Sequence, residues 1–360
     1  MRTALSRRAL RPLVAATAAS LLLAACASGG TDDPADPAAT SGASDDVFPV
    51  TLTNTFGETT IESEPTAVAT VNWGNHDVPI ALGIVPVGFA KATYGDDDED
   101  GVHPWTYEGL EALDATGDGL PELFDETDGI PYEAVNNTSP DVVLAAYSGL
   151  TEDDWTTLSQ IAPTVSYPEF AWGTNWQDMA LVNGEALGRK AEAQALVDDV
   201  LARIDDALAQ VDEALAARPD IEGKTVAYTW IDPSDPSTIG VYTPLDARVQ
   251  LLADLGMTNA PSVLELAGDT DQFFVDLAAE QADALSDVDV LVTYGDDTTL
   301  ARLQADPLLS KIPAVARGSV AVIPDGVPLA SATSGPTILS VPWALDAYLD
   351  IFQGAAERVG

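Results

Sequence analysis

The chain has 360 residues, 46% of them hydrophobic, and a formal net charge of −43 at pH 7. This length is enough for two domains with separate cores. The excess of 58 Asp and Glu over 15 Lys and Arg excludes nucleic acid as a partner, because phosphate binding needs basic patches. It also disfavours adhesion to anionic lipid. The one cysteine, Cys26, excludes an internal disulfide.

The N-terminus has the pattern of a secretory signal. Four arginines within residues 2–11 precede an apolar run at residues 13–23, which is too short to span a bilayer as a stable helix. The run ends in Leu-Ala-Ala-Cys26 followed by small residues, which resembles a bacterial lipobox. We therefore expect residues 1–25 to be removed and Cys26 to carry lipid on the extracytoplasmic face of the cell membrane. The alternative is a plain signal peptide followed by a chance cysteine.

The next segment changes in composition. Residues 26–47 are rich in Ser, Gly, Ala, Thr, Pro and Asp, which predicts a flexible tether. Residues 48–61 then predict a hairpin with Gly57 at the turn. Further strands are predicted at residues 67–73, 85–90, 141–147 and 163–167, and helices at residues 75–82, 131–136 and 151–161, the last capped by Thr151. This alternation indicates a parallel sheet and an N-terminal α/β lobe over residues 48–175.

The central segment predicts one long bridging helix over residues 176–218. Residues 177–217 contain no proline, and Pro219 ends the pattern. Apolar side chains recur at steps of four and three, which places them on one face of a helix. They are Val197, Leu201, Ile204, Leu208, Val211 and Leu215.

The α/β pattern resumes in a C-terminal lobe over residues 219–360. Strands are predicted at residues 225–231, 239–242, 288–294 and 320–323, and helices near residues 245–255, 274–284 and 338–352. The lobes echo each other, since Asp141 and Asp289 each lead a buried strand that ends in Tyr147 or Tyr294. The sequence thus predicts an α/β fold of two Rossmann-like lobes joined by one long helix, with a ligand cleft between them at the strand ends.

Several segments carry a family resemblance. DGIPYEAVNNTSPDVVLAAYSGLTEDDWTTLSQIAPTV (residues 128–165), ALGIVPVGFA (residues 81–90) and SGPTILSVPWALD (residues 334–346) resemble stretches of ferric-siderophore-binding proteins of ABC importers. So do residues 172–197, 251–257 and 306–323. The resemblance implies two lobes on a stiff helix, small closure, and an iron chelate delivered to a membrane permease. A cobalamin or haem is the alternative ligand.

The candidate ligand contacts stand at predicted strand ends and in loops. Chelated iron already has its donor atoms, so the cleft needs aromatic faces, hydrogen-bond donors and one or two cations rather than metal ligands. The candidates are Trp73, His76, Lys91, Tyr94, Trp172, Trp176, Trp230, Tyr242 and Arg248. By the resemblance, Arg248 matches a position at which related binders place an arginine facing the ligand; the alternative is a solvated helix residue. We expect Tyr147 and Tyr294 to pack between elements.

Two acids are candidates for a different contact. By the resemblance, Glu133 and Glu280 match the pair that docks onto basic sockets of the permease; the alternative is two more acids on an acidic surface.

The acidity of the chain also favours neutral or cationic hydroxamate chelates over anionic catecholates.

Other chemistries have weaker support. His76 and His103 are too few for a direct metal site, and residues 114–125 match a calcium loop poorly. The sequence has neither a G-x-S-x-G nor a G-x-G-x-x-G motif, so a surface hydrolase remains only as the enzyme alternative. We expect no catalytic residues, no resident metal and no cofactor beyond the chelate, and a monomer.

Overall fold

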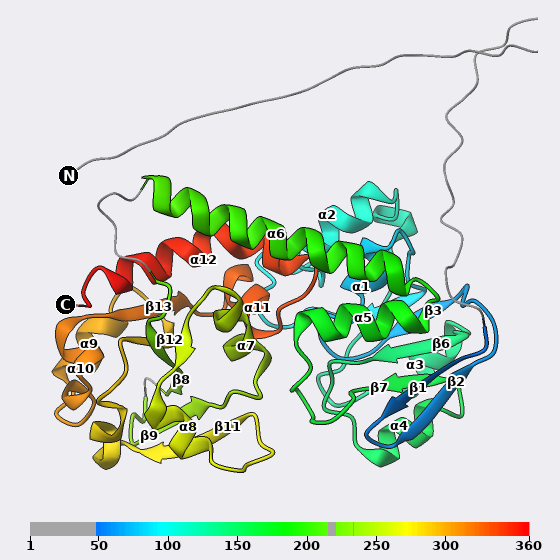
Figure 1. Cartoon of the computed structure of the whole chain (residues 1–360). Coiled ribbons are helices and arrows are strands. Elements are labelled where there is room, and N and C mark those ends of the chain that lie inside the picture. The colour runs from blue at the N-terminus through cyan, green and yellow to red at the C-terminus, as the bar shows by residue number, and fades with distance from the viewer. Residues whose placement is uncertain (1–47, 215–220, 233, 360) are drawn as a thin grey trace, which may run out of the picture. The chain divides into compact units, whose positions relative to one another are not determined.

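The computed structural model of the protein describes residues 48–214, 221–232 and 234–359. The predicted leader, lipid-attachment site and tether at residues 1–47 lie outside these residues. The described chain forms two α/β lobes (Figure 1), which confirms the predicted fold class. None of the described helices is long and apolar enough to cross a membrane.

The N-terminal lobe is built on a parallel sheet with strand order β5-β4-β3-β6-β7. Its strands are β3 (Val68–Thr70), β4 (Gly88–Ala90), β5 (Glu122–Phe124), β6 (Val142–Ala145) and β7 (Thr164–Ser166). Every residue of β3 and β6 is buried, as expected for short apolar strands covered on both faces. The predicted hairpin is confirmed as β1 (Val50–Asn54) and β2 (Gly57–Ile61).

Short helices surround this sheet. They are α1 (Asp77–Ala81), α2 (Pro104–Ala112), η1 (Gly117–Gly119), α3 (Tyr132–Asn137) and α4 (Glu152–Leu158). Thr151 caps α4 as predicted, in a reciprocal capping box with Asp154. Helix α2 and strand β5 were not predicted from the sequence.

The bridging segment corrects the prediction of one helix over residues 176–218. The described part consists of α5 (Trp176–Ala186) and α6 (Lys190–Ala214). Gly188 separates them with a φ of +67°, a left-handed conformation that ends helices. The amide of Arg189 then turns back to the carbonyl of Gly184 at 2.8 Å. The predicted apolar positions from Val197 to Leu208 lie on α6, from which Val197 and Ile204 join the central core. Residues 215–218 of the predicted helix, with Leu215, lie outside the described residues.

The C-terminal lobe has a mixed sheet with strand order β11-β9-β8-β12-β13. Its strands are β8 (Thr225–Ile231), β9 (Thr238–Tyr242), β10 (Thr258–Asn259), β11 (Phe274–Ala278), β12 (Val290–Gly295) and β13 (Val320–Pro324). Strand β8 pairs in parallel with β10 and β12, and β12 with β13, whereas β9 runs antiparallel to both β8 and β11.

The helix predicted at residues 274–284 is wrong. Residues 274–278 form β11, which pairs with β9, and η2 (Ala279–Leu285) follows as a 3₁₀ helix. The other helices are α7 (Ala247–Asp254), α8 (Pro261–Ala267), α9 (Thr299–Ala305), η3 (Leu309–Lys311), α10 (Pro313–Arg317), α11 (Pro328–Ser334) and α12 (Ser340–Ala356).

The internal echo of the two lobes has a structural basis. The carboxylate of Asp141, which precedes β6, accepts hydrogen bonds from the backbone amides of Thr66 and Ala67 at 2.8 and 3.0 Å, just before β3. Asp289, which precedes β12, accepts one from the amide of Thr225 at the start of β8, at 3.0 Å. In each lobe the leading acid therefore ties the entrance of one central strand to the entrance of its neighbour.

Helix packing and hydrogen bonds join the lobes. Helices α6 and α12 pack against each other within one hydrophobic core, to which Tyr348 and Phe352 of α12 belong (Figure 1). The hydroxyl of Thr337, just ahead of α12, donates to the fully buried carboxylate of Asp77 at the start of α1.

Candidate functional site

A cavity of about 550 Å³ lies between the lobes and is lined by both. Most of its walls come from residues at the carboxyl ends of strands, where the fold class places ligands. Eight of its lining residues are aromatic. The lining comprises Trp73, Tyr94, Tyr147, Trp172, Trp230, Tyr242, Arg248, Phe273, Tyr294, Asp325 and Ser334.

The N-terminal wall is a chain of aromatic rings. Trp73, half exposed, lies with its ring centre 5.6 Å from that of Trp172, which in turn meets Tyr147 edge-to-face at 5.4 Å. The indole of Trp172 covers Gly149 so closely that a Cβ there would approach its Nε1 to 2.5 Å. Glycine at this position therefore permits the indole to form the wall of the cavity.

The C-terminal wall contains a buried cation, Arg248. Its Nε lies 2.7 Å from Oδ1 of Asp246, and its Cζ lies 4.0 Å from the centre of the Tyr242 ring. Burial raises the pKa of Asp246, although the guanidinium opposes that rise. Burial alone would lower the pKa of Arg248, but the Asp246 carboxylate and the surrounding tyrosines together outweigh it, and the pKa stays raised. The cavity thus has a permanent positive charge stacked on an aromatic ring.

A hydrogen bond crosses the cavity from lobe to lobe. The hydroxyl of Tyr94, after β4, donates to Oδ1 of Asp325, after β13, at 2.6 Å. Ser331 of α11 donates to the carbonyl of Tyr94. Burial raises the pKa of Tyr94, and the hydrogen bond to Asp325 adds to that rise. The tyrosine therefore remains a neutral donor at physiological pH.

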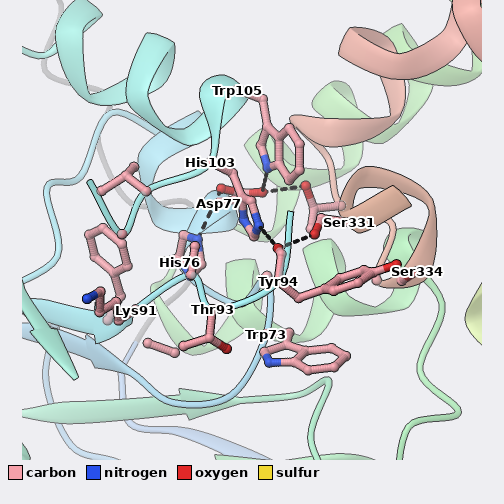
Figure 2. Close-up of a pocket in the computed structure, with 18 residues that line it drawn as sticks. Trp73, His76, Asp77, Lys91, Thr93, Tyr94, His103, Trp105, Ser331 and Ser334 are labelled. Atoms are coloured by element: carbon pink, nitrogen blue, oxygen red, sulfur yellow. Dashed lines mark hydrogen bonds and ion pairs between the residues drawn. The ribbon is translucent and has the colours of Figure 1, made fainter. Parts of the chain in front are cut away.

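A smaller pocket of about 40 Å³ adjoins the cavity behind Trp73 and Tyr94 (Figure 2). At its base, the Asp77 carboxylate accepts hydrogen bonds from Trp105 Nε1 at 2.9 Å and Thr106 Oγ1 at 2.7 Å, besides that from Thr337. Burial, with a smaller contribution from the charge of His103, lowers the pKa of His76 to about 3. His76 is therefore neutral in the folded protein.

The structure distributes the predicted ligand contacts unevenly. The cavity is lined by Trp73, Tyr94, Trp172, Trp230, Tyr242 and Arg248. His76 and Lys91 line only the smaller pocket. Trp176 lines neither and corrects the prediction: it is fully buried at the start of α5, and its Nε1 donates to Asp254 at 2.9 Å.

The structure also places the two tyrosines expected to pack and the two acids expected to dock. Tyr147 and Tyr294 belong to the core packing, as expected, but they also line the cavity. Sequence reasoning missed Phe273, which precedes β11, Asp325, which follows β13, and Ser334, which ends α11. Glu133 on α3 and Glu280 on η2 are both exposed.

These features define a class of protein with two α/β lobes enclosing an aromatic cavity for a solute. The model of the periplasmic binding protein family matches residues 68–327. The chain therefore belongs to the periplasmic binding protein family.

Solved structures provide more specific comparisons. PiaA of Streptococcus pneumoniae in complex with ferrichrome is 43% identical, with a TM-score of 0.81, over 86% of this chain and 99% of that chain. A periplasmic solute binding protein of Mycobacterium smegmatis is 24% identical, with a TM-score of 0.66, over 85% of this chain and 98% of that one. Staphylococcus aureus SirA complexed with staphyloferrin B is 18% identical, with a TM-score of 0.61, over 84% and 97%. The last two show the fold alone. No curated protein matches the sequence.

Proposed function

We propose that this protein is the substrate-binding lipoprotein of an ABC importer, which captures a ferric siderophore and delivers it to a membrane permease. The observation that carries the proposal is the aromatic cavity with Arg248 in its wall. Aromatic faces suit stacking against a large chelate, and the arginine suits its oxygen atoms. PiaA, which is 43% identical to this chain, has been solved in complex with ferrichrome. This similarity supports a ferric hydroxamate as the ligand.

The proposal includes an anchor and a docking surface. Lipid on Cys26 would hold the protein at the extracytoplasmic face of the membrane. Residues 26–47 would act as a flexible linker that lets the two lobes move away from the membrane surface. Glu133 and Glu280 are exposed, one on each lobe, which suits contact with basic sockets of a permease. We propose no resident metal or cofactor, because iron would enter only inside its chelate.

Tryptophan fluorescence tests the proposal. Trp73, Trp172 and Trp230 line the cavity, so ferrichrome should quench the emission of the full-length protein saturably at a 1:1 ratio. Trp172→Phe should reduce the quenched fraction. Trp176→Phe is the matched control, since Trp176 lies outside the cavity.

Titrations with a ferric catecholate, haem, cobalamin and free ferric ion complete the test. If haem or cobalamin saturates the protein and no siderophore gives a response, the ligand is haem or cobalamin and not a siderophore. Chemical turnover of a bound ligand would instead support the hydrolase alternative. A response to free iron alone would overturn the proposal.

A further inference from the structure

A side cavity of about 110 Å³ lies on the C-terminal lobe beside the proposed ligand cavity. Trp230, Tyr294 and Asp325 line both cavities. Trp230 also lines a third cavity, of about 380 Å³, on the side of β9 and β11. Its indole is 48% exposed, so it is accessible from more than one side. The side cavity is therefore reachable by an arm of a ligand held in the main cavity.

The side cavity is acidic. Three carboxylates line it, those of Asp232, Asp306 and Asp325. One cation, Arg302, lines it as well, but its guanidinium already donates to Thr299 at 2.9 Å and lies 3.4 Å from Asp296. Three carboxylates and one guanidinium, which already has partners of its own, give the lining of the side cavity a net negative charge. The resulting electrostatic field favours binding of a cation.

A buried hydroxyl in the same cavity lacks a partner. Thr293 is 1% exposed, and its Oγ1 forms no hydrogen bond with the described residues. Buried polar atoms are nearly always hydrogen-bonded, so such an atom in the lining of a cavity indicates a missing partner, and a hydroxyl can accept a hydrogen bond as well as donate one. A protonated amine supplies three donors.

The aromatic wall fits the same ligand. An ammonium group is attracted to the face of an indole, and more strongly where carboxylates stand nearby. The cavity volume exceeds what one water needs, which is on the order of 10–15 Å³, so an alkylammonium group can enter it.

We propose that this side cavity is a subsite for the protonated amine of a cationic hydroxamate chelate. The inference rests on the proposed function and narrows it to a substrate class. Trp230 supplies the aromatic face, Asp232 and Asp325 the charge, and the Thr293 hydroxyl an acceptor.

A matched pair of ligands tests the subsite. Ferric desferrioxamine B is a linear trihydroxamate with one pendant primary ammonium, and its N-acetylated form is the same chelate without that charge. The wild-type protein should bind the ammonium form about tenfold more tightly, and this ratio should shrink as salt is raised. Asp232→Asn and Thr293→Val should each lower the ratio, with less effect on the acetylated form.

Asp235→Asn is the control variant, because Asp235 lines the third cavity but not the side cavity. It should leave the ratio unchanged. Equal binding of the two chelates by the wild type, or a ratio insensitive to both test variants, would overturn the subsite while leaving the proposed function in place. Tighter binding of an N-succinylated, anionic form would also overturn the ammonium subsite, because it would mean that the side cavity binds an anion through Arg302. Binding of no ferric hydroxamate at all would overturn the proposed function itself.

Discussion

Arg248 and Asp246 form a buried ion pair, with 2.7 Å between Nε and Oδ1, in the wall of the proposed ligand cavity. Asp246 also caps α7 by accepting a hydrogen bond from the amide of Arg248 at 3.0 Å. Arg248, which lines the proposed ligand cavity, is thus held by the carboxylate that begins its own helix. Binding and stability are coupled at this point.

Arg248→Gln should lower the free energy of unfolding by about 3 kcal/mol, because it leaves a buried carboxylate without its counter-charge. It should also weaken ferrichrome binding. Adding Asp246→Asn should recover much of the stability, since Asn can still cap α7, but not the affinity. Urea unfolding and fluorescence titration measure the two effects. A double variant as unstable as the single one would argue against the coupling.

Tyr94→Phe should weaken ferrichrome binding about two- to twelvefold. The ring would remain in the cavity wall, but the hydrogen bond to Asp325 between the lobes would be lost, and such a bond contributes about 0.5–1.5 kcal/mol. Calorimetric titration measures the change. Tyr107→Phe, at an exposed position on α2, should bind like the wild type. An affinity unchanged in Tyr94→Phe would mean that the hydrogen bond does not hold the binding-competent arrangement.

Acidification should destabilise the wild type more than His76→Gln. The pKa of His76 is lowered from 6.5 to about 3 in the folded protein. Between these values the unfolded chain binds a proton that the folded chain does not, so stability falls as pH falls through this window. The unfolding free energy of the wild type should drop by about 2 kcal/mol more than that of the variant between pH 7 and pH 4.5. Parallel pH profiles of the two proteins in urea would contradict this.

Replacing both Glu133 and Glu280 by Gln should reduce cellular uptake of the ferric chelate about tenfold, because charge pairs steer and hold such complexes. Ligand affinity of the isolated protein should not change, since neither residue lines the cavity. Glu58→Gln, at an exposed position on β2, is the control for loss of a negative charge elsewhere. Normal uptake by the double variant would show that these two residues do not contribute to docking onto the permease.

Cys26→Ser should release the protein from the membrane fraction into the medium while its ferrichrome affinity stays unchanged. Cell fractionation and titration of the released protein measure these outcomes. Retention in the membrane would contradict lipid attachment at Cys26. Loss of binding would contradict the separation of anchor and site.

The elements that the sequence predicts well are those whose residues are covered on both faces. Strand β8 occupies the predicted residues, and β6 and β12 lie within or close to theirs, because continuous apolar runs leave few alternatives. The break at Gly188 was also accessible, since Leu-Gly-Arg after a helical run is a common helix ending. The prediction instead followed the absence of proline, which is a weaker signal.

The errors at the site arise from partners distant in sequence. The loop before Trp176 is rich in Gly, Thr and Asn, which indicates an open segment. Asn175, however, caps α5, and the indole of Trp176 reaches Asp254, 78 positions away. Likewise, Phe273 and Asp325 reach the cavity only through the pairing of β11 with β9 and of β13 with β12. No local pattern specifies such pairings.

The hydrogen bond between Thr337 and Asp77 has a consequence for assembly. The two residues are 260 positions apart, and the chain is synthesised from its N-terminus. Asp77 is fully buried and lies in the first helix of the N-terminal lobe, so that lobe cannot provide all the donors of its own carboxylate. Until the segment ahead of α12 has been made and docked, the Asp77 carboxylate lacks one of its three side-chain donors. Maturation of the cavity should therefore be among the last steps of folding, which would keep half-made chains from capturing ligand.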